Sequence, residues 1–467
     1  MKQKIANIPR SLPDIQRDYL TKVFKSIEGL KAMIMDQNSS DLISVNFLQS
    51  EGFELEVFLF EDIKSVRTEK LPFVSAVYFV NATLDNLKRI FAELKDPNFK
   101  DYHFFFMSDI SDDVIRNMAE LDRQNLIKNL SRFYFNYHAP SNECFHAGHK
   151  DPKPNSPEAL MIQEVNQSEE ALLSVFASLR KLPSIRYVRD SAVGLSLAER
   201  INRKLKKISE NFGNEFESGQ AVLLIVERKE DAITPLLFHW NYMSLINELL
   251  DVKSNRVRVE GKDFNLSLQH DDFYRDNMWS NYGDLAQALT RKLQSLSSRK
   301  QQSMEVKKFE DMQRLLGELP QLNKESSSVT KHMTIMNEIT QQVSSRNLLK
   351  ISQLEQEIAT RDRPKDFMKE VSDIFALKGP KLSDKFRLLV LFYFRFQATE
   401  PAIFRTLQDE FFALSGAEEY ISAFTTVQNH YQRSKRNTSL LLPIGDKAFQ
   451  FYKEMFGVSL SEHAQRP

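Results

Sequence analysis

The sequence predicts a protein of class α/β plus all-α, with two α/β domains that contain parallel sheets and a long helical third domain. Two patterns predict this class: short apolar runs alternate with amphipathic segments in the first half, and long helical patterns run from about Asp284 nearly to the end. The length of 467 residues exceeds what one hydrophobic core serves, so two to four domains are expected.

Composition is that of an ordinary globular protein, with 42% hydrophobic and 27% charged residues. Lys plus Arg and Asp plus Glu both number 63, so the chain has no net charge that would favour binding to nucleic acid or to an acidic membrane. The single cysteine, Cys144, fits a reducing compartment. The start lacks a signal-peptide core, and the densest apolar run, "FRLLVLFYFRF", is short and contains two arginines. A cytoplasmic protein that does not span a membrane is expected.

The first domain is expected over residues 1–138. Its buried strands are predicted in "LKAMIMD", "LEVFLF", "VSAVYFV" and "YHFFFMSD", and "TLDNLKRIFAELKD" is predicted as a helix with Leu84, Leu87, Ile90, Phe91 and Leu94 on one face. Such alternation of strands and helices favours a mostly parallel sheet covered on both faces.

A polar segment rich in proline and histidine, residues 138–158, is predicted as a domain boundary or a long surface loop. His138, Cys144, His146 and His149 are zinc-ligand types, but their spacing matches no standard zinc module, so a solvated loop is favoured over a metal site. The middle domain, residues 139–252, then contains the strong strand "AVLLIV".

The helical region is expected as a hairpin subdomain, residues 253–361, and a second helical subdomain, residues 362–467. A first helix carries Phe309, Met312, Leu315, Leu316 and Leu319 on one side, and Pro320 is expected to bend or stop it because proline lacks an N–H and clashes with the preceding turn. The polar run "NKESSS" would supply the turn, and the return helix would begin near Val329.

The segment "ERKEDAITPLLFHWNYMSLINELL", residues 227–250, contains acids, a base and a histidine. Periodicity favours a strand, a turn and a packed helix there, with Pro235 in the first helical turn. The alternative is a hydrolase or transferase that uses His239 with Asp231, although neither a nucleophile elbow nor a phosphate-binding loop is present. A second alternative is nucleic-acid binding through the basic run "YQRSKRN".

Residues 227–250 closely resemble the characteristic segment of the SM (Sec/Munc) family of SNARE-binding proteins. Two further segments, "LPSIRYVRDSAVGLSLAERI" and "DDFYRDNMWSNYGDLAQAL", resemble other elements of the family in the same order. The segments "AMIMD", "LPQLNKESSSVTKHM" and "VSSRNLLKISQLEQEIA" are most similar to its vacuolar protein sorting branch. Glu227 departs from the family, which usually has aspartate there. The chain also ends where relatives continue into a tail that completes the sheet of the middle domain.

The resemblance implies an arch of three domains that regulates vesicle docking and fusion, with no covalent chemistry and no cofactor or metal. The implied partners are a syntaxin-type SNARE, the assembled SNARE bundle and a vesicle-side SNARE, bound by a monomer associated with Golgi or endosomal membranes only through these partners. The first domain is the expected syntaxin-binding domain, with an apolar peptide pocket at Ile115, Met118, Ile127 and Leu130; alternatively, all four pack against the sheet. The hairpin is expected to bind SNAREs through Leu316, Leu319, Pro320, Leu322, Val329 and His332. Structural roles are expected for Arg186, Tyr187, Glu227, Arg228, Asp231, Pro235 and Trp240. Arg228 and Asp231 are expected to join the strand end to neighbouring loops through charge-assisted hydrogen bonds, with Arg228 in a buried pair.

Overall fold

The computed structural model describes residues 11–66, 69–148, 157–212, 216–304 and 309–432. The chain divides into two compact units. The first consists of Met1–Ile225, Val252–Arg258 and Lys262–Asp276, and the second consists of Val226–Asp251, Val259–Gly261 and Asn277–Pro467.

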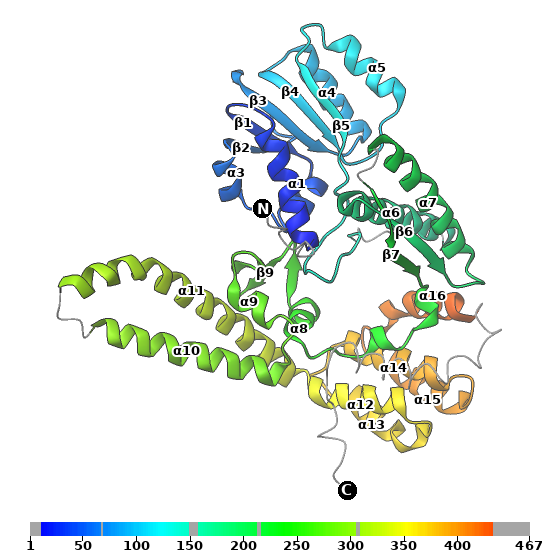
Figure 1. Cartoon of the computed structure of the whole chain (residues 1–467). Coiled ribbons are helices and arrows are strands. Elements are labelled where there is room, and N and C mark those ends of the chain that lie inside the picture. The colour runs from blue at the N-terminus through cyan, green and yellow to red at the C-terminus, as the bar shows by residue number, and fades with distance from the viewer. Residues whose placement is uncertain (1–10, 67–68, 149–156, 213–215, 305–308, 433–467) are drawn as a thin grey trace. The chain divides into compact units, whose positions relative to one another are not determined.

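A five-stranded parallel sheet forms the first part of unit 1, with the order β2-β1-β3-β4-β5 (Figure 1). All four apolar runs predicted as strands lie in this sheet. The predicted parallel arrangement is confirmed, because every pair of neighbouring strands in the sheet is parallel. The strands are β1 (Lys31–Met35), β2 (Val57–Asp62), β3 (Leu71–Val80), β4 (Phe99–Phe106) and β5 (Ile127–Arg132).

Helices cover both faces of this sheet, because the strands carry apolar side chains on both sides. One core cluster lies against α1 and α2 and includes Phe24, Val77 and Phe79; the other lies against α4 and α5 and includes Ile90 and Met118. Leu84, which was predicted on the buried face of α4, is instead its exposed first residue. The helices are α1 (Leu12–Lys25), α2 (Gln37–Ile43), α3 (Gln49–Glu54), α4 (Leu84–Lys95) and α5 (Asp112–Leu121).

The second part of unit 1 pairs two parallel strands with two long helices. These elements are α6 (Pro157–Leu179), β6 (Lys181–Tyr187), α7 (Ala192–Phe212) and β7 (Glu217–Ile225). Leu173 and Phe176 of α6 pack with Ile201 and Leu205 of α7 over one face of this two-stranded sheet. The predicted strand "AVLLIV" is confirmed as β7, apart from its last residue.

A three-stranded meander, which the sequence patterns did not predict, follows. Its strands are β8 (Asp251–Lys253), β9 (Arg256–Val259) and β10 (Lys262–Asn265). Two-residue turns join them, and all four turn residues, Ser254, Asn255, Glu260 and Gly261, have positive φ angles between 47° and 74°. Such left-handed pairs match the twist of the strands that they connect.

Beyond the meander the described chain is helical. In unit 2 the short helix α8 precedes a pair of long helices, α10 and α11, which lie side by side, and a packed group formed by α12 to α16 (Figure 1). The helices are α8 (Tyr242–Leu249), α9 (Asp272–Asn277, at the junction of the units), α10 (Tyr282–Met304), α11 (Phe309–Ser345), α12 (Leu348–Thr360), α13 (Met368–Ala376), α14 (Leu382–Phe396), α15 (Pro401–Phe412) and α16 (Ile421–Gln432).

Candidate functional site

Residues 227–250 contact a buried charged centre that the sequence analysis missed. Glu355 of α12 is fully buried, and its two carboxylate oxygens accept hydrogen bonds at 2.8 Å from the Phe238 N–H and from Nε of Arg387 on α14. Arg387 Nη1 also donates to Glu248 at 2.6 Å, and its guanidinium lies over the Phe238 ring. Burial raises the pKa of Glu355 to about 7, although Arg387 and the Phe238 N–H act in the opposite direction.

Two further hydrogen bonds connect the same segment to the helices of unit 2. Trp240 Nε1 donates to Ser352 Oγ on α12 at 2.8 Å, and the Tyr242 hydroxyl lies 2.7 Å from Nδ1 of His332 on α11. Because His332 is completely buried, it is a core residue and not the exposed SNARE contact that was predicted. The segment thus holds α8, α11, α12 and α14 together.

The charged run that opens the segment lies nearer the surface. Glu227 pairs with Lys229 at 3.2 Å, and Asp231 Oδ1 accepts the backbone N–H groups of Ile233 and Thr234, which is the usual role of an aspartate in a turn. Arg228 was expected in a buried pair, but its side chain is exposed, so that expectation is wrong. Pro235 lies in the short 3-10 helix Thr234–Leu236 and not in α8, which begins only at Tyr242 behind the Asn241 cap.

The enzymatic alternative at His239 and Asp231 is not supported. Asp231 is engaged in its own turn, and the charged groups that influence His239 are Glu248 and Arg387. Burial lowers the pKa of His239, so this imidazole is mostly neutral at physiological pH.

The four residues of the expected peptide pocket do not share one surface. Met118 is fully buried in a core cluster, and Val114 and Leu121 of the same helix and Ile127 and Leu130 of β5 pack against this cluster. The spacing 114, 118, 121 defines the inward face of α5, so Ile115 points outward and is 40% exposed. The pocket as predicted is therefore wrong at Met118. Of the four residues Ile115 is exposed, and Ile127 and Leu130 are half-buried.

The helical hairpin is present, but its turn is not where the sequence predicted it. Helix α11 is continuous from Phe309 to Ser345, so it passes through both Pro320 and the run "NKESSS". Pro320 was expected to bend or stop the helix, and the expectation that it stops the helix is wrong. Leu322 and Val329 are buried with Leu296 of α10, and this packing stabilises helix on both sides of the polar run. The side chains of Leu316, Leu319 and Pro320 lie outside the described residues.

The two-stranded sheet carries Arg186 and Tyr187 at the end of β6, where they pair in register with Leu224 and Ile225. Both side chains are exposed. Ile185 and Leu223 pack against the core formed by α6 and α7, whereas Val222 and Leu224 are 62% and 63% exposed. Among the described residues the other face of this sheet is exposed, with Val222 and Leu224 of β7 beside Ser184 and Arg186 of β6. The basic run "YQRSKRN" lies almost entirely outside the described residues.

The described part of the histidine-rich loop does not have the geometry of a metal site. His138 and His146 form a small antiparallel bridge, and their rings stack with centroids 4.7 Å apart at 10°. Burial and the neighbouring His146 lower the pKa of His138 to about 4. Among the described residues no group of three His, Cys, Asp or Glu side chains could hold a metal ion; His149 lies outside them.

The sheet of unit 1 has its topological switch point between β1 and β3, which is where ligands of open α/β sheets usually bind. Asp36, directly after β1, fills this position. Its carboxylate accepts hydrogen bonds at 2.8 Å from Ser39 N, Asn81 N and Asn86 Nδ2. The crevice is thus closed by the chain's own hydrogen bonds, which favours a structural role for it.

The chain thus combines two parallel sheets covered by helices with a set of packed helices. Comparison with known proteins identifies the family that has this fold. The Sec1 family model matches residues 31–454, so the chain belongs to the Sec1 family. It is similar to vacuolar protein sorting-associated protein 45 of Dictyostelium discoideum, with 28% identity over 91% of this chain and 76% of the relative, and to the Homo sapiens protein of the same name, with 28% identity over 95% and 79%.

A solved structure described as the SM protein Vps45 in complex with the Qa SNARE Tlg2 matches 90% of this chain and 77% of that chain. Its TM-score is 0.82 and its sequence identity is 25%. The predicted family and fold class are thereby confirmed. Within the described part of the chain, no helix combines the length and the apolar character that crossing a membrane requires.

Proposed function

We propose that this chain binds syntaxin-class SNAREs and guides the assembly of SNARE complexes in vesicle docking and fusion. The observation that carries the proposal is the match, over 90% of the chain, to an SM protein solved with a Qa SNARE. Exposed apolar side chains such as Ile115 and Met333 support the proposal, because an extended amphipathic helix is held by scattered apolar anchors on a broad surface.

In this proposal residues 1–138 contact the syntaxin-type partner, 139–252 form the middle domain, 253–361 the SNARE-binding hairpin and 362–467 the second helical subdomain. In the same proposal the chain acts as a monomer and associates with Golgi and endosomal membranes through its SNARE partners. Similarity to relatives named for vacuolar protein sorting supports a role in transport at these membranes.

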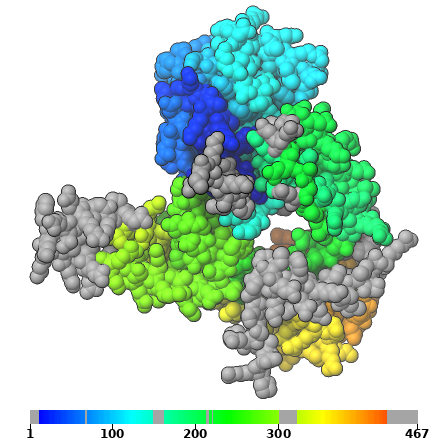
Figure 2. Space-filling view, in the orientation of Figure 1, coloured from blue at the N-terminus to red at the C-terminus, as the bar shows by residue number. Residues whose placement is uncertain are grey.

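The syntaxin contact is tested first at α5, which forms part of the cyan surface in Figure 2. Ile115→Lys is expected to weaken binding of a Qa SNARE about tenfold, since a charge replaces an exposed apolar anchor. Its melting temperature should stay that of wild type. Calorimetric titration of the purified chain with the SNARE measures both Kd and stoichiometry.

Two matched variants control this experiment. Leu84→Lys makes the same type of change at a residue of α4 that is 80% exposed, and should leave Kd unchanged. Met118→Lys places a charge in the core, and should unfold the first sheet before it affects recognition. Equal affinities of wild type and Ile115→Lys would exclude this surface as the syntaxin contact.

The hairpin is tested separately with Met333→Lys, because Met333 of α11 is 37% exposed. This variant is expected to weaken binding of a vesicle-side SNARE about tenfold and to leave Qa SNARE binding unchanged. Leu349→Lys on α12, 62% exposed, is the matched control. If both variants bind the vesicle-side SNARE as wild type does, the α11 surface at Met333 has no part in its recognition.

A further inference from the structure

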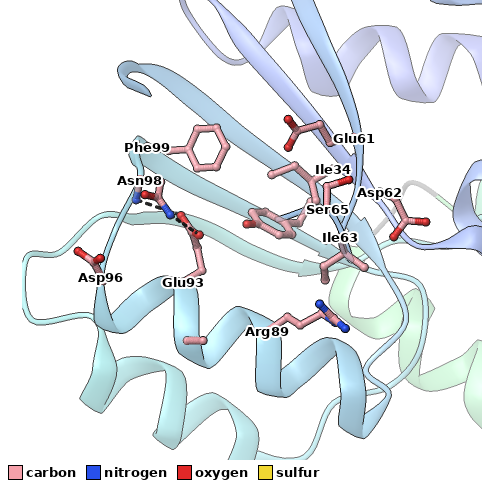
Figure 3. A pocket seen from close by; sticks show the side chains of 12 residues that line it. Ile34, Glu61, Asp62, Ile63, Ser65, Arg89, Glu93, Asp96, Asn98 and Phe99 are labelled. Atoms are coloured by element: carbon pink, nitrogen blue, oxygen red, sulfur yellow. Dashed lines mark hydrogen bonds between the residues drawn. The ribbon is translucent and has the colours of Figure 1, made fainter. Parts of the chain in front are cut away.

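A cavity of about 310 Å³ lies between the sheet of unit 1 and helix α4 (Figure 3). Acids in its lining have partners within the chain. Glu93 accepts the Tyr102 hydroxyl at 2.6 Å, Asp96 pairs with Lys70, and Asp62 accepts a backbone N–H of its own turn. Because these groups are already engaged, the cavity is better explained as part of the packing of this sheet than as a ligand site.

Residues 238–242 form a strap that connects parts of unit 2 far apart in the sequence. The strap leads into α8, and its backbone pairs with residues at the start of α10. Tyr282 N donates to Trp240 O at 2.9 Å, and Tyr242 N donates to Ser280 O at 3.0 Å. The strap is therefore fixed to the beginning of the hairpin formed by α10 and α11.

Groups of the strap also reach two further helices. The Tyr242 hydroxyl lies 2.7 Å from Nδ1 of His332 on α11, and both residues are fully buried. On α12, Ser352 Oγ accepts Trp240 Nε1 at 2.8 Å, and a carboxylate of the same helix accepts the Phe238 backbone N–H. The strap thus binds to the last helix of the hairpin and to the first helix of the group α12–α16.

The chain passes from the hairpin to this group through a sharp break. Helix α11 ends at Ser345 and α12 begins at Leu348, and between them Asn347 has the left-handed angles φ 55° and ψ 37°, which end a right-handed helix. Arg346 in the same break is paired with Asp384 of α14, so the break is held against the helical group. A few residues of this kind at the end of an element are the usual form of a hinge.

We propose that the strap fixes the direction of the hairpin relative to the group α12–α16, with Asn347 as the hinge. The covalent connection at Asn347 alone would let α11 change direction through small changes of backbone angles. The bonds of Tyr242 and Trp240 provide a second connection between α11 and α12, which bypasses the break. Because the hairpin is held at two points, its direction is fixed until the strap is released.

The direction of the hairpin matters for SNARE binding, and this step rests on the proposed function. Met333, the exposed residue at which the vesicle-side SNARE contact is tested, directly follows His332 on α11. The bond from Tyr242 holds His332 on the buried side of this helix. The strap therefore also sets the direction in which the surface at Met333 faces.

Electron paramagnetic resonance measures the direction of the hairpin as the distance between two spin labels. Cys144→Ser removes the single native cysteine, and Ser327→Cys on α11 and Glu370→Cys on α13 place the labels at exposed positions. Ser327 lies about 27 Å along α11 from the hinge, so a swing of about 20° moves its label by about 9 Å. Tyr242→Phe, which removes only the hydroxyl, should widen or shift the distance distribution by several ångströms.

Tyr282→Phe is the matched control. The Tyr282 hydroxyl donates to Thr340 Oγ1 at 2.9 Å, and both residues belong to the hairpin, so the distance distribution should not change. Asn347→Gly makes the hinge more flexible and keeps its left-handed conformation accessible. It should leave the distribution unchanged while the strap is intact, and should widen it further when combined with Tyr242→Phe.

Circular dichroism and thermal melts show whether each variant keeps its helices. If Tyr242→Phe does not fold, Ser352→Ala, which releases Trp240 from α12, gives the same test. The proposal is overturned if both variants leave the distribution unchanged, if Tyr282→Phe changes it as much as they do, or if Asn347→Gly widens it while the strap is intact. No SNARE takes part in the measurement, so the strap can be excluded without affecting the proposed function.

Discussion

Replacing Arg346 by alanine is expected to destabilise unit 2 by about 3 to 5 kcal/mol, the usual cost of breaking a buried ion pair from one side. Arg346 and Asp384 are 6% and 2% exposed at their side chains, and the guanidinium donates two parallel hydrogen bonds, at 3.0 and 2.6 Å, to the carboxylate. Asp384 also accepts the Lys381 N–H at the start of α14. Without Arg346 this carboxylate would remain buried with only part of its partners.

Tryptophan fluorescence measures the effect directly, because both tryptophans of the chain, Trp240 and Trp279, belong to unit 2. Urea unfolding followed by this signal should show a lower midpoint for Arg346→Ala. The urea midpoint of Arg346→Lys should lie between those of wild type and Arg346→Ala, since lysine restores the charge but cannot form two parallel hydrogen bonds to the carboxylate.

The matched control is Arg361→Ala. Arg361 pairs with Glu357 on α12 at 3.5 Å, but its side chain is 58% exposed, so its loss should cost less than about 0.5 kcal/mol. A similar loss of stability in both variants would mean that burial does not govern the strength of the Arg346 pair.

The sheet of unit 1 could be predicted because its strands are buried on both faces and appear as continuous apolar runs. The meander could have been predicted as well. The two-residue turns Ser254-Asn255 and Glu260-Gly261 flank the alternating strand "RVRV", and Asn255 and Gly261 are residue types that favour the positive φ angles of hairpin turns.

Two local predictions were wrong, and in the first of them tertiary packing outweighed sequence preference. Pro320 and "NKESSS" predict a break, yet the burial of Leu322 and Val329 against α10 keeps α11 helical. The dense charge around Arg228 suggested a buried pair, whereas that side chain is exposed. A charged run after a strand does not reveal which of its members is buried.

The buried ionic centres were missed because their members are far apart in the sequence. Glu355 lies more than a hundred residues from Phe238, and its partner Arg387 lies on a different helix. One signal was available, since Glu355 occupies the apolar face of α12 defined by Ile351, Leu354 and Ile358. An acid at such a position requires a partner, but the sequence does not name it.

Glu355 is expected to make the stability of unit 2 depend on pH. Its pKa is about 7 in the folded chain, against 4.5 for an ordinary glutamate, with burial as the largest cause. Between these values the folded state binds a proton that the unfolded state has released. The contribution of this group is therefore most favourable below about pH 4.5, falls as pH rises toward 7, and is constant above it, with a total change of up to about 3 kcal/mol.

Glu355→Gln isolates this effect, because glutamine cannot titrate and still offers an oxygen to the Phe238 N–H, while Arg387 keeps Glu248. Urea unfolding by tryptophan fluorescence at pH 5.5, 6.5, 7.5 and 8.5 gives the free energy of unfolding for both proteins. Subtracting the variant from wild type cancels distant histidines, so Glu355 and its coupling to Arg387, Glu248 and His239 remain. This difference should fall steadily from pH 5.5 to 7.5 and then level off. A difference that is flat across the series, or that rises with pH, would mean that Arg387 holds Glu355 ionised throughout, and that attraction rather than burial governs this carboxylate.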